Sequence, residues 1–153
     1  MRAVIQRVKS SKVKINNEIV GKINGGLLIL LAVHVNDALK DIDWLVKKVL
    51  NLRIFEDENG KMNKSVSNVG GEILVVSQFT LYGDCKKGNR PSFIESARPE
   101  KAKEYYEKFV EQMRTAGISA ATGKFQEHME VELINDGPTT IIIDSLRSAF
   151  SKK

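Results

Sequence analysis

Two apolar runs constrain the fold of this chain more strongly than any other feature. Residues 27–33 read Leu-Leu-Ile-Leu-Leu-Ala-Val, and a second run begins with Ile-Leu-Val-Val at residue 73 and extends to Phe79. A strand with one face in water alternates apolar and polar side chains, and neither run alternates in this way. We therefore predict two strands, at residues 27–33 and 73–79, that are covered on both faces.

Antiparallel strands are predicted at the beginning of the chain. Residues 2–8 are rich in β-branched and apolar side chains, and Val13, Ile15 and Ile19 alternate with polar positions. The pair Asn16–Asn17 lies between them, and asparagine tolerates the positive φ angles of a tight hairpin turn. The first segments of the chain are therefore expected to pair as a hairpin.

Two amphipathic helices are predicted in the middle of the chain. After the pair Asn36–Asp37, which suits a helix N-cap, apolar residues between positions 39 and 50 recur with the 3.6-residue helical period. A second helix is predicted from Arg98–Pro99 to Gly117, because proline suits the first helical turn and glycine often follows the last one.

The order of these elements predicts a single mixed α/β domain. Strands come first, strands and helices alternate in the middle, and residues 129–134 and 139–143 add strands at the end, while residues 57–60 suit a turn. A chain of 153 residues suits one domain. At this size, folding buries about two thirds of the unfolded chain's surface, so no disulfide or structural metal is needed.

The composition predicts a soluble protein of the cytoplasm. Cys85 is the single cysteine, and the start Met1-Arg2-Ala3 lacks the basic-then-apolar pattern of a secretory signal. No apolar run approaches the roughly 20 residues that a membrane span requires, so no membrane association is expected.

The net charge favours an anionic partner. The formal charge is +5, and a basic surface attracts phosphate groups. Part of the excess lies in one loop that contains Lys86, Lys87 and Arg90. These three residues are candidates for contacts with phosphate, and the alternative interpretation is an ordinary solvated face. Charge alone does not identify the partner as RNA.

Side chains for the common hydrolytic mechanisms are scarce. A catalytic triad needs a histidine or a comparable base, and His34 and His128, the only histidines, lie outside any recognisable nucleophile motif. We interpret both as ordinary residues at strand ends. A hydrolytic zinc site needs clustered His or acidic ligands, which the sequence does not show, so we expect no metal and no cofactor.

Polar and aromatic side chains follow the second apolar run at Ser77-Gln78-Phe79-Thr80. Strand ends in α/β sheets commonly line ligand sites, and Gln78 can bond the edge of a base while Phe79 packs on a ring. An adenine with its ribose would therefore fit, and the alternative is a strand end with one polar turn. Thr80 is either a nucleophile or a positioning hydroxyl, and the lack of a neighbouring base favours positioning.

Two motifs together resemble the D-aminoacyl-tRNA deacylases. They are Ser-Gln-Phe-Thr-Leu at residues 77–81 and Asn-Asp-Gly-Pro-Thr-Thr at residues 135–140. The resemblance ends at Ser145, so we predict a deacylase domain at residues 1–145 and a C-terminal tail at residues 146–153. Further matching segments are residues 1–8, 51–57, 61–63 and 70–76.

The resemblance implies a three-layer β-β-α sandwich that forms a homodimer with its active sites at the subunit interface. It implies that Ser77, Gln78, Phe79 and Met62 bind the aminoacylated 3′ end of tRNA. Phe79 and Thr80 would be catalytic through backbone N–H groups that orient the ester and stabilise the reacting oxygen. The 2′-hydroxyl of the terminal adenosine would assist hydrolysis.

The resemblance also implies how L-amino acids are rejected. Gly137 and Pro138 would be joined by a cis peptide bond and form a tip that enters the partner subunit's active site, where it fills the space an L side chain needs. Arg7 matches the arginine that orients this tip. Thr139 departs from the valine that the family generally has after Gly-Pro, and its extra hydroxyl needs a partner if it is buried.

The expected function is chiral proofreading by a carboxylic ester hydrolase. Such an enzyme would hydrolyse D-aminoacyl-tRNA, and mischarged glycyl-tRNA(Ala), to free amino acid and tRNA. Two alternatives remain open. The first is a small esterase with Thr80 or Cys85 as its nucleophile, and the second is a basic RNA-binding module without catalysis.

Overall fold

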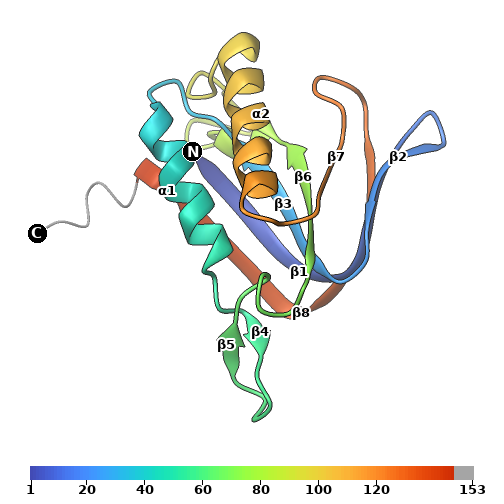
Figure 1. Cartoon of the computed structure of the whole chain (residues 1–153). Helices are drawn as coiled ribbons and strands as arrows, with labels where there is room; N and C mark the ends of the chain where they lie inside the picture. The colour runs from blue at the N-terminus through green and yellow to red at the C-terminus, as the bar shows by residue number, and fades with distance from the viewer. Residues whose placement is uncertain (147–153) are drawn as a thin grey trace, which may run out of the picture.

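Strands β3 (Gly26–Ala32) and β6 (Glu72–Ser77) run parallel through the centre of the computed structural model (Figure 1). Side chains of both strands alternate between two separate core clusters, so each strand is buried on both faces, which confirms the prediction. The structure describes residues 1–146, and residues 147–153 of the predicted C-terminal tail lie outside the described residues.

One sheet contains both central strands. Its order is β2-β1-β3-β6-β7, and β8 pairs with the other edge of β1. β1 is antiparallel to β2 and β3, and Asn16 and Asn17 turn the first hairpin with φ angles of 50° and 66°. The predicted N-terminal hairpin is therefore confirmed. The remaining strands of the sheet are β1 (Arg2–Ile15), β2 (Glu18–Ile23), β7 (Ala120–Thr122) and β8 (Glu130–Asp144).

Both helices cover one face of this sheet (Figure 1). Leu45 of α1 (Leu39–Leu50) and Phe109 of α2 (Pro99–Thr115) are fully buried in the cluster between the helices and the sheet. α2 begins at the predicted proline, and Gly117 follows its last turn with a φ of 85°, which confirms the predicted ends. In the described part of the chain, no helix is both long and apolar enough to cross a membrane.

The predicted N-cap of the first helix is wrong. The N-cap is Ala38, whose N–H donates to the Asp41 carboxylate at 2.9 Å. The Asp37 carboxylate is buried and accepts hydrogen bonds from the Met1 amino group at 2.5 Å and from the His34 N–H at 2.6 Å. A buried carboxylate must be paired, so the distant Met1 amino group and the nearby His34 N–H take the side chain that capping rules assign to the helix.

The far half of β1 and strand β2 curl over the face of β3 and β6 that the helices leave uncovered. Val13 and Ile23 pack there with Leu28 and Leu74 in the second core cluster. Gly21 of β2 lies so close to β7 that a Cβ atom would meet the Thr122 carbonyl oxygen at 2.2 Å. The two clusters separate three layers, and the predicted three-layer β-β-α sandwich is confirmed.

A single strand, β8, replaces the two strands predicted at residues 129–134 and 139–143. It pairs with β1 on both sides of the Gly-Pro motif, with Thr140 opposite Gln6 and Asn135 opposite Val8. Residues 136–139 therefore form a bulge opposite one residue of β1. A bulge adds residues to one strand without ending the pairing, and for this reason the chain does not reverse at the motif.

The strand that carries the bulge also contains an unpaired buried hydroxyl. Thr139 is 3% exposed, and within residues 1–146 its Oγ1 atom has no hydrogen-bond partner. Replacing this hydroxyl by a methyl group removes the desolvation cost, so Thr139→Val is expected to raise the free energy of unfolding by about 1 kcal/mol. Urea denaturation of Thr139→Val and of the exposed control Thr140→Val would measure the difference. A loss of stability in Thr139→Val alone would contradict the prediction.

Strand β6 ends two residues before the predicted Phe79. It stops at Ser77, and Phe79 begins the short 3₁₀ helix η1 (Phe79–Tyr82). The Gln78 N–H still donates to the Leu31 carbonyl of β3 at 2.8 Å. The chain thus leaves the sheet directly after its last ladder bond, at the polar residues that the sequence analysis singled out.

Candidate active site

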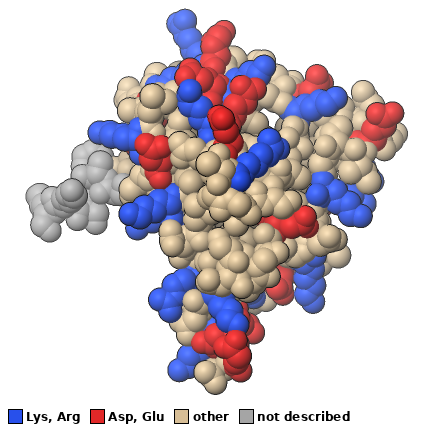
Figure 2. Space-filling view, viewed as in Figure 1, with Lys and Arg blue, Asp and Glu red and all other residues tan. Residues whose placement is uncertain are grey.

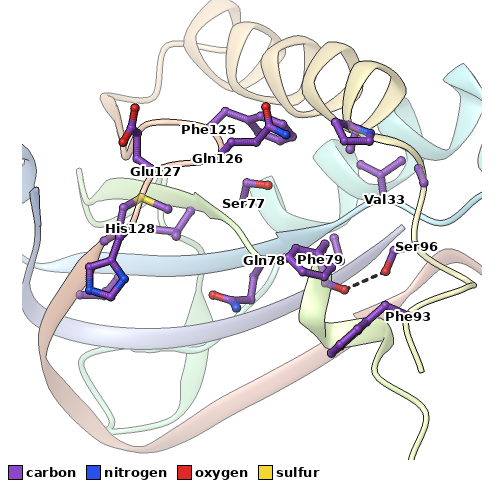
Figure 3. Close-up of a pocket in the computed structure, with 17 residues that line it drawn as sticks. Val33, Ser77, Gln78, Phe79, Phe93, Ser96, Phe125, Gln126, Glu127 and His128 are labelled. Carbon is purple, nitrogen blue, oxygen red and sulfur yellow. Dashed lines mark hydrogen bonds between the residues drawn. The ribbon is translucent and has the colours of Figure 1, made fainter. Parts of the chain in front are cut away.

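A pocket of about 530 Å³ opens beside the carboxyl ends of β3 and β6 (Figure 3). Its wall contains Ser77, Gln78 and Phe79, so the structure brings these three predicted residues together in one cavity. The start of α2 and the segment that leads into β8 complete the wall. The cavity therefore lies where strand ends commonly expose polar groups to a ligand.

Phe79 is held from two sides. Its side chain is 53% exposed and packs edge-on against Phe93, with ring centroids 5.2 Å apart. Its carbonyl oxygen accepts a hydrogen bond from the Ser96 hydroxyl at 3.0 Å (Figure 3). Ring and peptide group are thus both oriented by residues that precede α2.

Thr80 has no base beside its hydroxyl. The Thr80 Oγ1 atom accepts a hydrogen bond from the Gln78 side-chain amide at 2.5 Å, and the side chain is not part of the pocket wall. Within residues 1–146, no His, Lys, Asp or Glu side chain bonds this hydroxyl. The backbone N–H groups of Phe79 and Thr80 likewise have no acceptor among the described residues. The local chemistry supplies free donors rather than an activated nucleophile.

The wall opposite Ser77 was not foreseen from the sequence. It consists of residues 125–129, and Figure 3 shows Phe125 and Gln126 across the cavity from Ser77. His128 precedes β8, as its interpretation as a strand-end residue implies, but it also lines the pocket. This segment has no periodic pattern or motif, and only the tertiary fold brings it to the end of β6.

Tyr106 fixes α2 above the strand that leads into the pocket. Its phenol donates a hydrogen bond to the Val75 carbonyl at 2.8 Å, and burial raises the pKa of Tyr106 to about 12. The phenol therefore stays protonated at neutral pH and keeps its donor. The helix and the strand end are thereby held at a fixed separation.

Met62 does not lie in the pocket of its own chain. It is an exposed residue of β5 (Met62–Lys64), which pairs with β4 (Phe55–Glu56) in a hairpin that projects from the body of the molecule (Figure 1). The turn predicted at residues 57–60 joins these two strands and is confirmed. The structure therefore does not bring Met62 together with Ser77, Gln78 and Phe79 in one cavity.

Arg7 is buried and holds the bulge of β8. Its Nε atom donates to the Asp136 carbonyl at 3.0 Å, and Nη1 donates to the Ile54 carbonyl at 2.6 Å. The neighbouring Gly137–Pro138 peptide bond is cis, and neither residue lines the pocket of its own chain. Arg7 therefore contacts the residue that precedes Gly137, and it is a buried residue rather than a surface one.

The three cations of the predicted RNA contact lie on the loop between η1 and α2. Lys86, Lys87 and Arg90 are all exposed, and none forms an ion pair with another residue in the range 1–146. On the face shown in Figure 2, Lys and Arg side chains are interspersed with Asp and Glu over the helices and the projecting hairpin. The excess charge is therefore not concentrated on that face.

Sequence comparisons with known proteins find deacylases that act on aminoacyl-tRNA, by the names that these proteins carry. The sequence pattern described as "D-Tyr-tRNA(Tyr) deacylase" matches residues 4–144. A D-aminoacyl-tRNA deacylase of Clostridioides difficile (strain 630) is 57% identical over 148 residues, which cover 97% of this chain and 99% of the relative. A protein of the same name from Natranaerobius thermophilus is 59% identical over 146 residues, covering 95% of this chain and 97% of the relative.

A solved structure has the same fold. The structure named "c-Myc DNA Unwinding Element Binding Protein" superposes with a TM-score of 0.89 at 42% sequence identity, covering 95% of this chain and 99% of that chain. Sequence and fold comparisons span the strands, the helices and the pocket described above. The chain belongs to the D-Tyr-tRNA(Tyr) deacylase family.

Proposed function

We propose that this protein hydrolyses the ester that links a D-amino acid to the 3′ end of tRNA. Relatives that are more than half identical over nearly the whole chain are named D-aminoacyl-tRNA deacylases. The observation that carries the proposal is the end of β6, where Ser77, Gln78 and Phe79 line one pocket and Phe79 and Thr80 supply unpaired backbone donors. A site of this kind suits an ester whose developing oxyanion needs donors.

The proposed mechanism uses the substrate's own 2′-hydroxyl. The Thr80 hydroxyl is bonded to an amide rather than to a base, so it serves as a positioning group and not as the nucleophile. The N–H groups of Phe79 and Thr80 orient the ester carbonyl and stabilise the charge that develops on its oxygen. Gln78 and the aromatic ring of Phe79 hold the terminal adenosine.

Rejection of L-amino acids is assigned to the bulge at Gly137–Pro138. This bulge does not line the pocket of its own chain, and the proposal places it in the pocket of a second copy within a homodimer. Gly137 and Pro138 are exposed, and the nearest atom to a Cβ added at Gly137 would be the side-chain amide of Asn135, at 2.4 Å. A small, exposed tip anchored by Arg7 through Asp136 would fill the space that an L side chain needs and leave room for a D side chain.

Glycine attached to tRNA(Ala) is the second proposed substrate. Glycine carries a hydrogen atom where an L-amino acid carries its side chain, so a tip that works by exclusion does not reject it. Editing of this kind is useful where a synthetase cannot discriminate sufficiently by binding alone.

One set of deacylation assays separates this function from its alternatives. Purified protein would be incubated with D-tyrosyl-tRNA, L-tyrosyl-tRNA, glycyl-tRNA(Ala) and D-tyrosine ethyl ester. We expect release of D-tyrosine and glycine from tRNA, with L-tyrosyl-tRNA and the simple ester left intact. Turnover of the simple ester at a similar rate would favour a small esterase with Thr80 or Cys85 as nucleophile. Binding of every tRNA without release of amino acid would favour an RNA-binding module.

The basic loop is proposed to bind phosphate without selecting the amino acid. Replacing Lys86, Lys87 and Arg90 by glutamine is expected to weaken tRNA binding and to flatten its salt dependence by up to about 2 to 3 log units per log unit of salt, because fewer counterions are released. Filter binding between low and physiological salt would measure the slope. The ratio of D-tyrosyl-tRNA to glycyl-tRNA cleavage should not change.

A matched control removes the same number of charges elsewhere. Lys40, Lys47 and Lys48 are exposed residues of α1, and their replacement by glutamine should change the salt slope much less. The assignment fails if the loop variant keeps the wild-type slope while its substrate ratio shifts about tenfold, which corresponds to about 1.4 kcal/mol of discrimination.

A further inference from the structure

Ser96 is a pocket residue whose hydroxyl reaches the backbone of the candidate active site. The Ser96 Oγ atom donates to the Phe79 carbonyl oxygen at 3.0 Å, and the residue lines the same cavity as Phe79 (Figure 3). The side chain is half-exposed, and it does not cap α2, whose N-cap is Arg98. Its described hydrogen bond is thus made to the peptide that follows Phe79.

The backbone around Ser96 is firmly attached to the end of β3. The Val35 N–H donates to the Glu95 carbonyl, and the Ala97 N–H donates to the Val33 carbonyl, each at 2.9 Å. His34 and Ser96 form an antiparallel bridge between these two bonds. Ser96 therefore presents its hydroxyl from a fixed position. The groups proposed to bind the substrate lie on other segments, at the end of β6 and in η1.

A hydrogen bond to the Phe79 carbonyl also controls the neighbouring donor. Phe79 C=O and Thr80 N–H belong to one planar trans peptide, so they point in opposite directions, and holding the carbonyl toward Ser96 holds the N–H away from it. Accepting a hydrogen bond at the oxygen polarises the peptide and strengthens its N–H as a donor. Within the described part of the chain this N–H has no acceptor, so it is available to a ligand.

We propose that Ser96 is a positioning residue for the reaction, which orients and polarises the Phe79–Thr80 peptide so that the Thr80 N–H binds the reacting ester oxygen. The inference rests on the proposed deacylase function, and it assigns to Ser96 no contact with the reacting atoms. Phe93 acts in parallel, because it holds the Phe79 ring while Ser96 holds the carbonyl. Two residues of the loop before α2, Phe93 and Ser96, thereby orient a single active-site residue, Phe79.

The test compares Ser96→Ala with Ser96→Thr in D-tyrosyl-tRNA deacylation. Loss of the hydroxyl is expected to lower kcat about fivefold to tenfold, the rate equivalent of one hydrogen bond, and to change KM less than about twofold. Threonine keeps the hydroxyl and should restore most of kcat. Because the side chain is half-exposed, the Tm of Ser96→Ala should stay within about 2 °C of wild type. Ser92→Ala, on the same loop, is the matched control and should keep wild-type kcat.

Each outcome decides the role of Ser96. Wild-type kcat in Ser96→Ala overturns the inference and leaves the deacylase function standing. Equal losses of kcat in the Ala and Thr variants, or a loss confined to KM, also overturn it, because neither follows from a missing donor. Failure of the wild-type protein to release D-tyrosine from tRNA overturns both the function and the role of Ser96.

Discussion

D-Tyrosyl-tRNA that ends in 2′-deoxyadenosine is expected to be hydrolysed about 10² to 10⁴ times more slowly than the ordinary substrate, which is the usual contribution of a general acid or base. In the described part of the chain, the Thr80 hydroxyl has no base bonded to it that could take over the role of the missing group. The Thr80 hydroxyl accepts its hydrogen bond from Gln78, and within residues 1–146 no titratable side chain bonds it. Single-turnover release of D-tyrosine from the two substrates would measure the ratio.

Two controls keep this result interpretable. The deoxy substrate should compete with ordinary D-tyrosyl-tRNA at a similar concentration, which shows that it still binds. Thr80→Ala should keep measurable activity, because the proposed donor at this position is the backbone N–H. Rapid turnover of the deoxy substrate, or an acyl group trapped on Thr80 and detected by mass spectrometry, would establish a side-chain nucleophile instead.

Arg7→Ala is expected to lower both stability and chiral selectivity. Arg7 is 6% exposed and donates to the carbonyls of Ile54 and Asp136. Without its guanidinium these two acceptors lose their donor, so the free energy of unfolding should fall by about 2 to 4 kcal/mol. The bulge that carries Gly137–Pro138 also loses its anchor. The ratio of D- to L-tyrosyl-tRNA cleavage should therefore fall, by about tenfold for each 1.4 kcal/mol of lost discrimination.

Arg53 provides a matched control for this experiment. It also makes two hydrogen bonds, to the backbone and side chain of Asn63 at 3.0 and 2.7 Å, but it is exposed on the surface. Arg53→Ala should leave the ratio unchanged, and Arg7→Lys should fall between wild type and Arg7→Ala, because an ammonium group lacks the planar fork. Chemical denaturation and paired deacylation assays would measure both effects. An unchanged ratio in a destabilised Arg7→Ala protein would show that selectivity lies elsewhere.

Predictions made from one short segment were confirmed where the structure of that segment depends little on distant residues. The absence of alternation in residues 27–33 and 73–76 requires apolar neighbours on both faces of a strand, and the two core clusters provide them. The Asn16–Asn17 turn and the ends of α2 followed from backbone preferences of single residues. Such features depend little on the rest of the chain.

Predictions of the same kind were wrong where a distant group competed for a residue. Asp37 suits an N-cap, but the distant Met1 amino group binds its buried carboxylate. Two separate strands were predicted at residues 129–134 and 139–143, but β1 pairs with the chain on both sides of the Gly-Pro motif and keeps β8 continuous. In both cases a contact with a residue distant in sequence determined the structure, and the local preference did not.

The sequence by itself determined the fold class, the family and the residues at the end of β6, because these depend on short motifs and on the periodicity of apolar side chains. Only the tertiary structure decided what faces those residues. The segment 125–129 and Ser96 come from distant parts of the chain, and the curled sheet and α2 bring them to the pocket. Met62 and the bulge at Gly137–Pro138 lie outside it. A pocket is made of side chains far apart in sequence, and packing of the layers, rather than any local pattern, sets their distances.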